Sequence, residues 1–123
     1  MRNISFSLTT PQFRARTKDV TRRLGWGCLK AGDRIMGCEK CMGRRKGEPL
    51  VRLGVIEIVS VRAEPLDAMT LFPEYGAEEC RREGFPEMTP AQFVEFFCGS
   101  HADCTPQTAV NRIEFRYVEE GKA

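Results

Sequence analysis

A lysine, a threonine and an arginine lie close together in the segment KDVTRR, residues 18–23. A turn between Lys18 and Thr21 would bring an ammonium group and a hydroxyl together. In an extended chain, Thr21 and Arg23 would point to the same side. A cleft could use this hydroxyl and these cations for chemistry, since functional groups concentrate on loops held by rigid elements. The alternative is a solvated basic turn beside a helix end. Arg22, which the alternation sends to the other side, is expected to be solvated only.

Glu83 is a second candidate residue, because it falls at the predicted C-terminal end of a helix, where the helix dipole disfavours a negative charge. The neighbouring Arg81 and Arg82 can compensate that charge, and Glu83 then needs no other partner. Alternatively, Glu83 pairs with Lys18 across the fold and sets its protonation state. A lysine acts as a base only if burial or nearby cations lower its pKa.

The strands that must position these side chains are predicted by the spacing of apolar residues. Alternation of apolar and polar residues predicts strands over residues 4–8 and 110–118. A run rich in β-branched residues predicts a long strand over residues 50–66, with Gly54 as a bulge or bend. A Gly-Asp turn at residues 32–33 precedes a further strand.

Helices are predicted at three places. Thr10 is the expected N-cap of a short helix, and a second helix occupies residues 73–84 with a glycine at its end. Thr89 begins the third helix and forms a capping box with Gln92. The phenylalanines of this third helix are expected in the core: Phe93, Phe96 and Phe97. The order of elements favours an α+β fold, a small curled sheet or barrel with helices packed at one side.

The composition, with 41% hydrophobic and 29% charged residues, is ordinary for a soluble protein, and residues 1–123 are expected to form a single domain. No apolar run is long enough for a membrane span, and the N-terminus lacks the apolar core of a secretory signal, which favours a cytoplasmic protein. Residues 1–52 hold 13 lysines and arginines against 4 acidic residues, whereas residues 53–123 hold 6 against 13. This asymmetry suits a basic groove for RNA or a nucleotide, unless the two halves neutralise each other.

Six cysteines raise the question of a metal site. Nothing in the sequence indicates export, which argues against a disulfide framework. A tetrahedral zinc site would draw its ligands from one Cys-x-x-Cys pair and a second, irregular group: Cys38, Cys41, Cys98, His101 and Cys104. Because only one of these groups has the regular spacing, reduced and partly buried thiols are the favoured interpretation, and no metal or other cofactor is predicted.

The segment TKDVTRR resembles the Lys-x-x-Thr-x-Arg signature of ASCH domains (activating signal cointegrator homology), which belong to the PUA-like β-barrel group. Later segments resemble the remaining elements of that family in the same order: LKAGDRIMG, VRLGVIEIVSVRAEPL, REGFPEMTPAQFVEFF and VNRIEFRYV. The likeness covers about residues 4–118 and is greatest to the ASCH proteins of bacteria and phages. It implies a small PUA-like β-barrel, a curled mixed sheet with flanking helices.

The resemblance also implies an activity. ASCH proteins include bacterial amidohydrolases that remove the acyl group from N4-acylated cytidine nucleosides, an activity attributed to a threonine, a lysine and a glutamate. By their place in the motifs, these would be Thr21, Lys18 and Glu83. Thr21 would attack the acyl carbonyl or position a water, and Lys18 would take the proton or stabilise the oxyanion. Glu83 would orient Lys18 or protonate the leaving nitrogen, and Arg23 would hold the intermediate or the ribose.

A second hypothesis is a non-catalytic RNA-binding module, or a ribonuclease, because PUA-like domains bind RNA or modified nucleotides in the same cleft. The basic loop GRRKGE, residues 43–48, would contribute through Arg44, Arg45 and Lys46. Trp26 would either stack on a base at the rim of the cleft or plug the end of the barrel. Under either hypothesis the predicted partner is RNA or a modified nucleoside.

Overall fold

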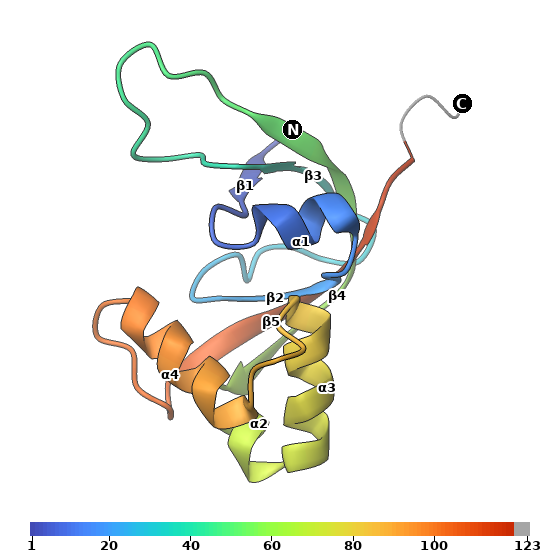
Figure 1. The fold of residues 1–123 in the computed structure, drawn as a ribbon. Helices are drawn as coiled ribbons and strands as arrows, with labels where there is room; N and C mark the ends of the chain where they lie inside the picture. The colour runs from blue at the N-terminus through green and yellow to red at the C-terminus, as the bar shows by residue number, and fades with distance from the viewer. Residues whose placement is uncertain (120–123) are drawn as a thin grey trace.

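The computed structural model describes residues 1–119 (Figure 1). Within them the strands are β1 (Asn3–Ser5), β2 (Val20–Arg23), β3 (Arg34–Cys38), β4 (Arg52–Pro65) and β5 (Ala109–Tyr117). The helices are α1 (Thr10–Ala15), α2 (Ala68–Leu71), α3 (Pro73–Glu83) and α4 (Pro90–Ser100). The predicted order of a strand, a short helix, further strands, helices and a final strand is confirmed.

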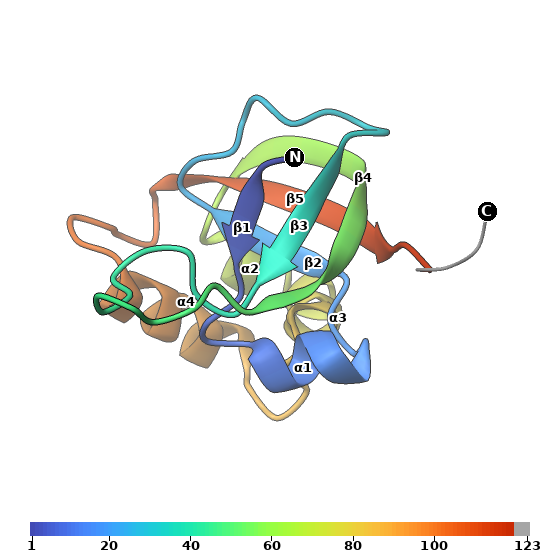
Figure 2. The same cartoon turned by 90° about the horizontal axis from the view of Figure 1, so that it is seen from above.

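The strands form one mixed sheet in the order β1-β3-β4-β5-β2. β1 pairs with β3 in parallel, and the other neighbours are antiparallel. The register of β3 against β4 shifts beside Gly54, where an irregularity is predicted. The sheet curls but is not closed, because β1 and β2 remain its two edges (Figure 2). The expected α+β fold, a curled mixed sheet with flanking helices, is therefore confirmed, without full closure of a barrel.

Two hydrophobic cores stabilise this arrangement. One lies inside the curl of the sheet and contains Ile4, Phe6, Phe13, Leu29, Ile35, Ile56, Ile58, Ile113 and Phe115. The other joins α2, α3 and α4, which gather together at one end of the molecule in Figure 1, and contains Leu66, Met69, Cys80, Phe85, Phe93, Val94, Phe97 and Val110. The core position predicted for Phe93 and Phe97 is confirmed, and Phe96 packs against the same cluster while partly exposed.

The signals at the ends of the helices are largely confirmed. Thr89 and Gln92 form the predicted capping box, and Gly84 ends α3 with a left-handed backbone, φ 97°. The prediction for α1 is wrong by one residue, because Thr9 is the N-cap and Thr10 Oγ1 donates to the carbonyl of Phe6. The sequence pattern does not predict α2, whose 4 residues are too few to show a helical period. No helix among the described residues has the length and apolar character that a membrane span requires.

Gly76 in α3 is expected to tolerate no side chain. A Cβ atom there would lie 1.9 Å from the carbonyl oxygen of Met69 in α2 and 2.8 Å from Pro90 Cγ in α4. Because backbone atoms must move to relieve this overlap, Gly76→Ala should lower the free energy of unfolding by about 1–3 kcal/mol, measured by urea denaturation. Gly99→Ala in α4 is the matched control: it meets no atom within 4 Å and should stabilise the helix slightly. Equal effects of the two substitutions would contradict this packing.

Candidate functional site

A pocket of about 280 Å³ lies where the two edges of the sheet come together. Ser5 and Phe6 enter it from the end of β1, and Thr21 and Arg23 enter it from β2. Arg23 joins the two edges, since its Nη2 donates to the carbonyl of Ser5 (2.6 Å) and its guanidinium lies 5.0 Å from the centre of the Phe6 ring. The pocket thus lies between β1 and β2, the two edge strands that would pair with each other if the sheet closed into a barrel.

Lys18 and Glu83 form a buried ion pair at this pocket. Lys18 Nζ donates to Glu83 Oε1 (2.7 Å) and to the carbonyl of the same residue (2.9 Å). The two residues are only 2% and 3% exposed. Burial lowers the pKa of Lys18, and the charge of Glu83 opposes this only in part, because the cations of Arg23 and Arg22 lower it further. The structure therefore places these two candidate catalytic residues in contact, in surroundings that lower the pKa of the lysine.

Thr21 lines the same pocket but is held by a different neighbour. Its Oγ1 accepts a hydrogen bond from Arg23 Nε (3.0 Å), and its side chain is buried. Among the described residues, no hydrogen bond joins this hydroxyl to Lys18 or to Glu83. Burial lowers the pKa of Arg23 to about 10, so this guanidinium remains a cation at neutral pH. Arg23 contacts Thr21 and the Ser5 backbone, so its predicted contact with a ligand stays a prediction.

The expectation that Arg22 is only solvated is wrong. Alternation does send its side chain to the face opposite Thr21, but α3 covers that face. The side chain is fully buried, and Arg22 Nη1 donates to Glu83 Oε2 (3.1 Å) while Nη2 donates to Glu79 Oε1 (2.6 Å). Arg112 Nη2 in turn donates to Glu79 Oε2 (3.0 Å). A buried chain of charges therefore continues from Lys18 through Glu83 and Arg22 into the interface between the sheet and α3.

Sequence reasoning missed this network, although one signal for it was available. Tyr75, Glu79 and Glu83 follow one another at intervals of four residues, which places them on one face of α3. Polar residues on the face of a helix that packs on a sheet require partners from that sheet. Arg22 and Arg112, which are register partners on β2 and β5, supply those partners.

An aromatic wall completes the pocket on the side of the helices. It is formed by Phe85, Phe93, Phe96 and Phe97, with Leu8 and His101 nearby. His101 stacks on Phe97 at 4.1 Å between ring centres, and its Nδ1 lies 2.9 Å from the Phe97 carbonyl oxygen. The residues that line the site also include Lys18, Arg22, Arg23 and Glu83, so basic groups and one carboxylate lie beside a flat apolar surface, which suits a planar, polar ligand.

The remaining predicted ligand-binding residues lie outside this pocket. Trp26 is partly buried and packs against the core inside the sheet. The guanidinium of Arg2 lies over its ring, 5.2 Å from the ring centre. Arg44, Arg45 and Lys46 are exposed on the loop between β3 and β4. None of these four side chains is among the residues that line the pocket, so they would have to contact a ligand that extends beyond it.

The possible zinc ligands do not assemble. Within residues 1–119, no group of three or more His, Cys, Asp or Glu side chains is arranged to hold a metal ion. Cys98 and Cys104 lie 3.7 Å apart at sulfur, and His101 is occupied by its contact with Phe97. Cys38, the last residue of β3, is buried, and its thiol points to the carbonyl of Met36 (3.7 Å). The zinc alternative therefore has no support in this part of the chain.

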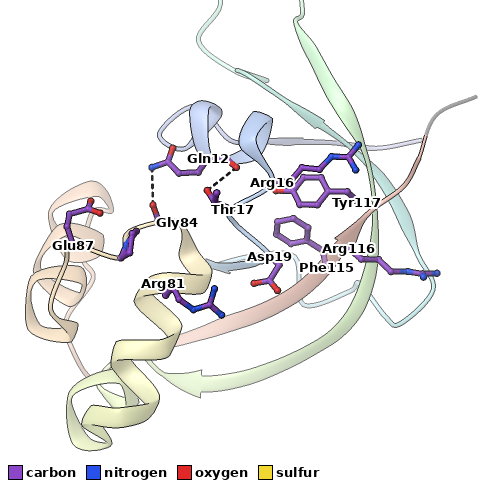
Figure 3. A pocket seen from close by; sticks show the side chains of 11 residues that line it. Gln12, Arg16, Thr17, Asp19, Arg81, Gly84, Glu87, Phe115, Arg116 and Tyr117 are labelled. Atoms are coloured by element: carbon purple, nitrogen blue, oxygen red, sulfur yellow. Dashed lines mark hydrogen bonds between the residues drawn. The ribbon is translucent and has the colours of Figure 1, made fainter.

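A larger hollow of about 780 Å³ lies between α1, the end of α3 and β5 (Figure 3). Figure 3 shows Gln12 extending from α1 toward the carbonyl of Gly84, with a hydrogen bond of 3.3 Å. The arginines around this hollow already have acidic partners: Arg16 pairs with Glu119, Arg81 with Glu78 and Arg116 with Glu57. Because Lys18, Thr21 and Glu83 do not line it, the smaller pocket is the stronger candidate site.

Solved structures of two other proteins have a fold similar to that of this chain. A protein from Enterococcus faecalis, described by the DUF984 family model, aligns with a TM-score of 0.61 and 13% identity over 96% of this chain and 76% of its own. An ASCH domain from Lactobacillus crispatus aligns with a TM-score of 0.57 and 14% identity over 94% of this chain and 78% of its own. No protein-family model and no curated protein matches the sequence. The chain has an ASCH-like fold, as the resemblance of its signature predicts.

Proposed function

We propose that the pocket binds a modified nucleobase and that Lys18, Thr21 and Glu83 remove the acyl group from an N4-acylated cytidine. The observation that carries this proposal is the buried contact between Lys18 and Glu83 in the pocket that Thr21 also lines. A lysine with a lowered pKa can give up its proton and then accept one from a hydroxyl. The volume of 280 Å³ is near the lower end of ligand pockets, roughly 300–1,000 Å³, which suits a ligand of about the size of a nucleobase.

The proposed reaction has two stages. Thr21 Oγ1 attacks the acyl carbonyl while the neutral amine of Lys18 accepts the hydroxyl proton. The Nε–H of Arg23, which already donates to Thr21 Oγ1, stabilises the negative charge on that oxygen as it forms. Lys18 returns the proton to the cytosine N4 as the C–N bond breaks, and the acyl group stays on Thr21 as an ester. A water then gives a proton to Lys18 and attacks the ester. Lys18 passes that proton to Thr21 Oγ1 as the ester C–O bond breaks, which releases the carboxylic acid and restores the hydroxyl and the neutral amine.

The activity is tested by incubating the purified protein with N4-acetylcytidine and measuring cytidine and acetate. We expect the two products in equal amounts, at a rate proportional to the concentration of protein and well above the rate in buffer. Release of cytidine no faster than in buffer would rule out the enzymatic proposal for this acyl group. Longer N4-acyl groups, assayed in parallel, would show whether the aromatic wall selects the chain length.

RNA binding is a second candidate function, favoured by a separate observation. The loop between β3 and β4 carries exposed Arg44, Arg45 and Lys46, and no ion pair among the described residues involves these three side chains. Exposed cations without carboxylate partners are available for phosphate groups. An RNA whose base enters the pocket could place its backbone along this loop, so the two functions are compatible.

Replacing Arg44, Arg45 and Lys46 together by alanine should weaken RNA binding. The slope of log affinity against log salt should become shallower by about 0.7 for each single-strand phosphate contact that is lost, measured by fluorescence anisotropy. The control replaces three exposed arginines that already pair with glutamates, Arg62, Arg81 and Arg116, and should change the slope much less. RNA affinity that does not depend on salt in the unaltered protein would refute this function.

A further inference from the structure

We infer that Arg22 is a positioning residue of the candidate site, which holds one oxygen of Glu83 so that the other is directed at Lys18. The inference deepens the proposed function and rests on it, because it assumes that Lys18 carries the proton in the reaction. Arg22 lies outside the Lys-x-x-Thr-x-Arg signature, whose positions in this chain are Lys18, Thr21 and Arg23. Its assignment comes from the contacts of its side chain alone.

The two carboxylate oxygens of Glu83 are divided between two cations. Oε1 accepts from Lys18 Nζ (2.7 Å), and Oε2 accepts from Arg22 Nη1 (3.1 Å). A carboxylate bound at both oxygens cannot rotate about its last bond without breaking a buried charge-assisted hydrogen bond. Arg22 therefore fixes the orientation in which Glu83 meets Lys18.

Arg22 is itself held in place from three sides. Its Nη2 donates to Glu79 Oε1 (2.6 Å) and to the Tyr75 hydroxyl (3.2 Å), both on α3, and lies 3.7 Å from Glu64 Oε2 on β4. These partners hold the guanidinium in place beside Glu83. The planar guanidinium presents its N–H donors from several nitrogens in a fixed fork, whereas a lysine has a single ammonium nitrogen.

Arg22 should lower the pKa of Lys18. The charged groups that face Lys18 are Glu83 from α3 and Arg22 and Arg23 from β2, and His101 lines the same pocket from the end of α4. Arg22 disfavours the protonated lysine directly, by repulsion, and indirectly, by sharing the negative charge of Glu83. Both effects disappear when Arg22 is removed, so the pKa of Lys18 should then rise. More of the lysine would be charged at neutral pH and unable to act as a base.

The test is an NMR titration of the Lys18 side chain in protein labelled with ¹³C-lysine, with the signal assigned through Lys18→Met. Arg22→Gln should raise the pKa of Lys18 by about 1 unit. The acidic limb of the pH profile for N4-acetylcytidine hydrolysis should move to higher pH by the same amount. The matched control is Arg112→Gln, which removes another buried arginine of the network that does not contact Glu83, and it should leave the Lys18 titration within about 0.2 unit of its starting point.

Each result of the titration either supports or overturns the positioning role of Arg22. An unchanged Lys18 pKa in Arg22→Gln, or an equal shift in Arg112→Gln, would overturn the inference and leave Arg22 with a structural role. If Arg22→Gln does not fold, Arg22→Lys replaces it: a lysine can keep the shorter contact with Glu79 but not both carboxylates, so the pKa of Lys18 should still rise, and no rise would overturn the inference. The titration needs no turnover, so a protein that fails to hydrolyse N4-acetylcytidine but shows the Lys18 shift refutes the proposed function while supporting the assigned position of Arg22.

Discussion

Thr21→Val should lower kcat/KM for N4-acetylcytidine by about 1,000-fold or more, because it removes the attacking oxygen and keeps the shape of the side chain. Thr21→Ser keeps the oxygen, and its hydroxyl can still accept from Arg23 Nε, so it should retain activity within about 10-fold of the unaltered protein. Comparison of the two variants distinguishes the effect of losing the hydroxyl from the effect of changing the packing of the side chain. The rates are measured by release of cytidine at pH values above the acidic limb of the profile.

The comparison requires that Thr21→Val still folds. Thr21→Val leaves the Arg23 Nε–H without its acceptor, at a cost of about 1–3 kcal/mol, which is less than the roughly 5–15 kcal/mol that stabilises a typical domain. Thr17→Val is the matched control: Thr17 is exposed, its hydroxyl donates weakly to the Gln12 carbonyl, and it does not line the pocket. It should keep full activity. If Thr21→Val retains substantial turnover, a water or another group is the nucleophile and the assignment of Thr21 is wrong.

The parts of the site that could be predicted are those encoded in local patterns. Lys18, Thr21 and Arg23 are adjacent in sequence, and the end of α3 at Glu83 follows from the glycine that comes next. The fold class followed from the same kind of signal, since long alternating runs and helix caps report on local backbone geometry. The sequence predicts the contact between Lys18 and Glu83 as one of two alternatives, the other being compensation of Glu83 by Arg81 and Arg82.

The parts that could not be predicted depend on which face of an element is covered. Alternation places Arg22 opposite Thr21 but does not reveal that α3 packs on that side, and so the sequence alone predicts a solvated arginine. The lining of the pocket has the same origin: the sequence predicts a core position for the phenylalanines of α4, and they both pack in the core and line the pocket. Long-range packing decides these points, and one sequence contains no direct record of it.

Glu79→Gln should lower the free energy of unfolding by about 3–5 kcal/mol, an effect large enough to threaten the fold. The carboxylate of Glu79 is 2% exposed and lies between two buried arginines, Arg22 and Arg112. Glutamine has nearly the same shape but no charge, so both guanidinium groups lose their compensating anion inside the protein. Glu78→Gln, one residue earlier in α3, is the control: the side chain of Glu78 is 55% exposed and, within residues 1–119, pairs only with Arg81, so the substitution should change stability by less than about 1 kcal/mol.

The pH dependence of stability provides an independent check on Glu79. Burial alone would raise its pKa, but the hydrogen bonds and charges of Arg112 and Arg22 prevail and lower it to about 2, from 4.5 for a free side chain. The folded state therefore binds this proton less readily than the unfolded state. The stabilisation, about 3 kcal/mol for such a shift, is fully present above pH 4.5 and is lost as the pH falls through 2. The difference in unfolding free energy between the unaltered protein and Glu79→Gln should shrink over this interval in urea titrations. A difference that stays constant with pH would mean that Glu79 acts through packing and not through its charge.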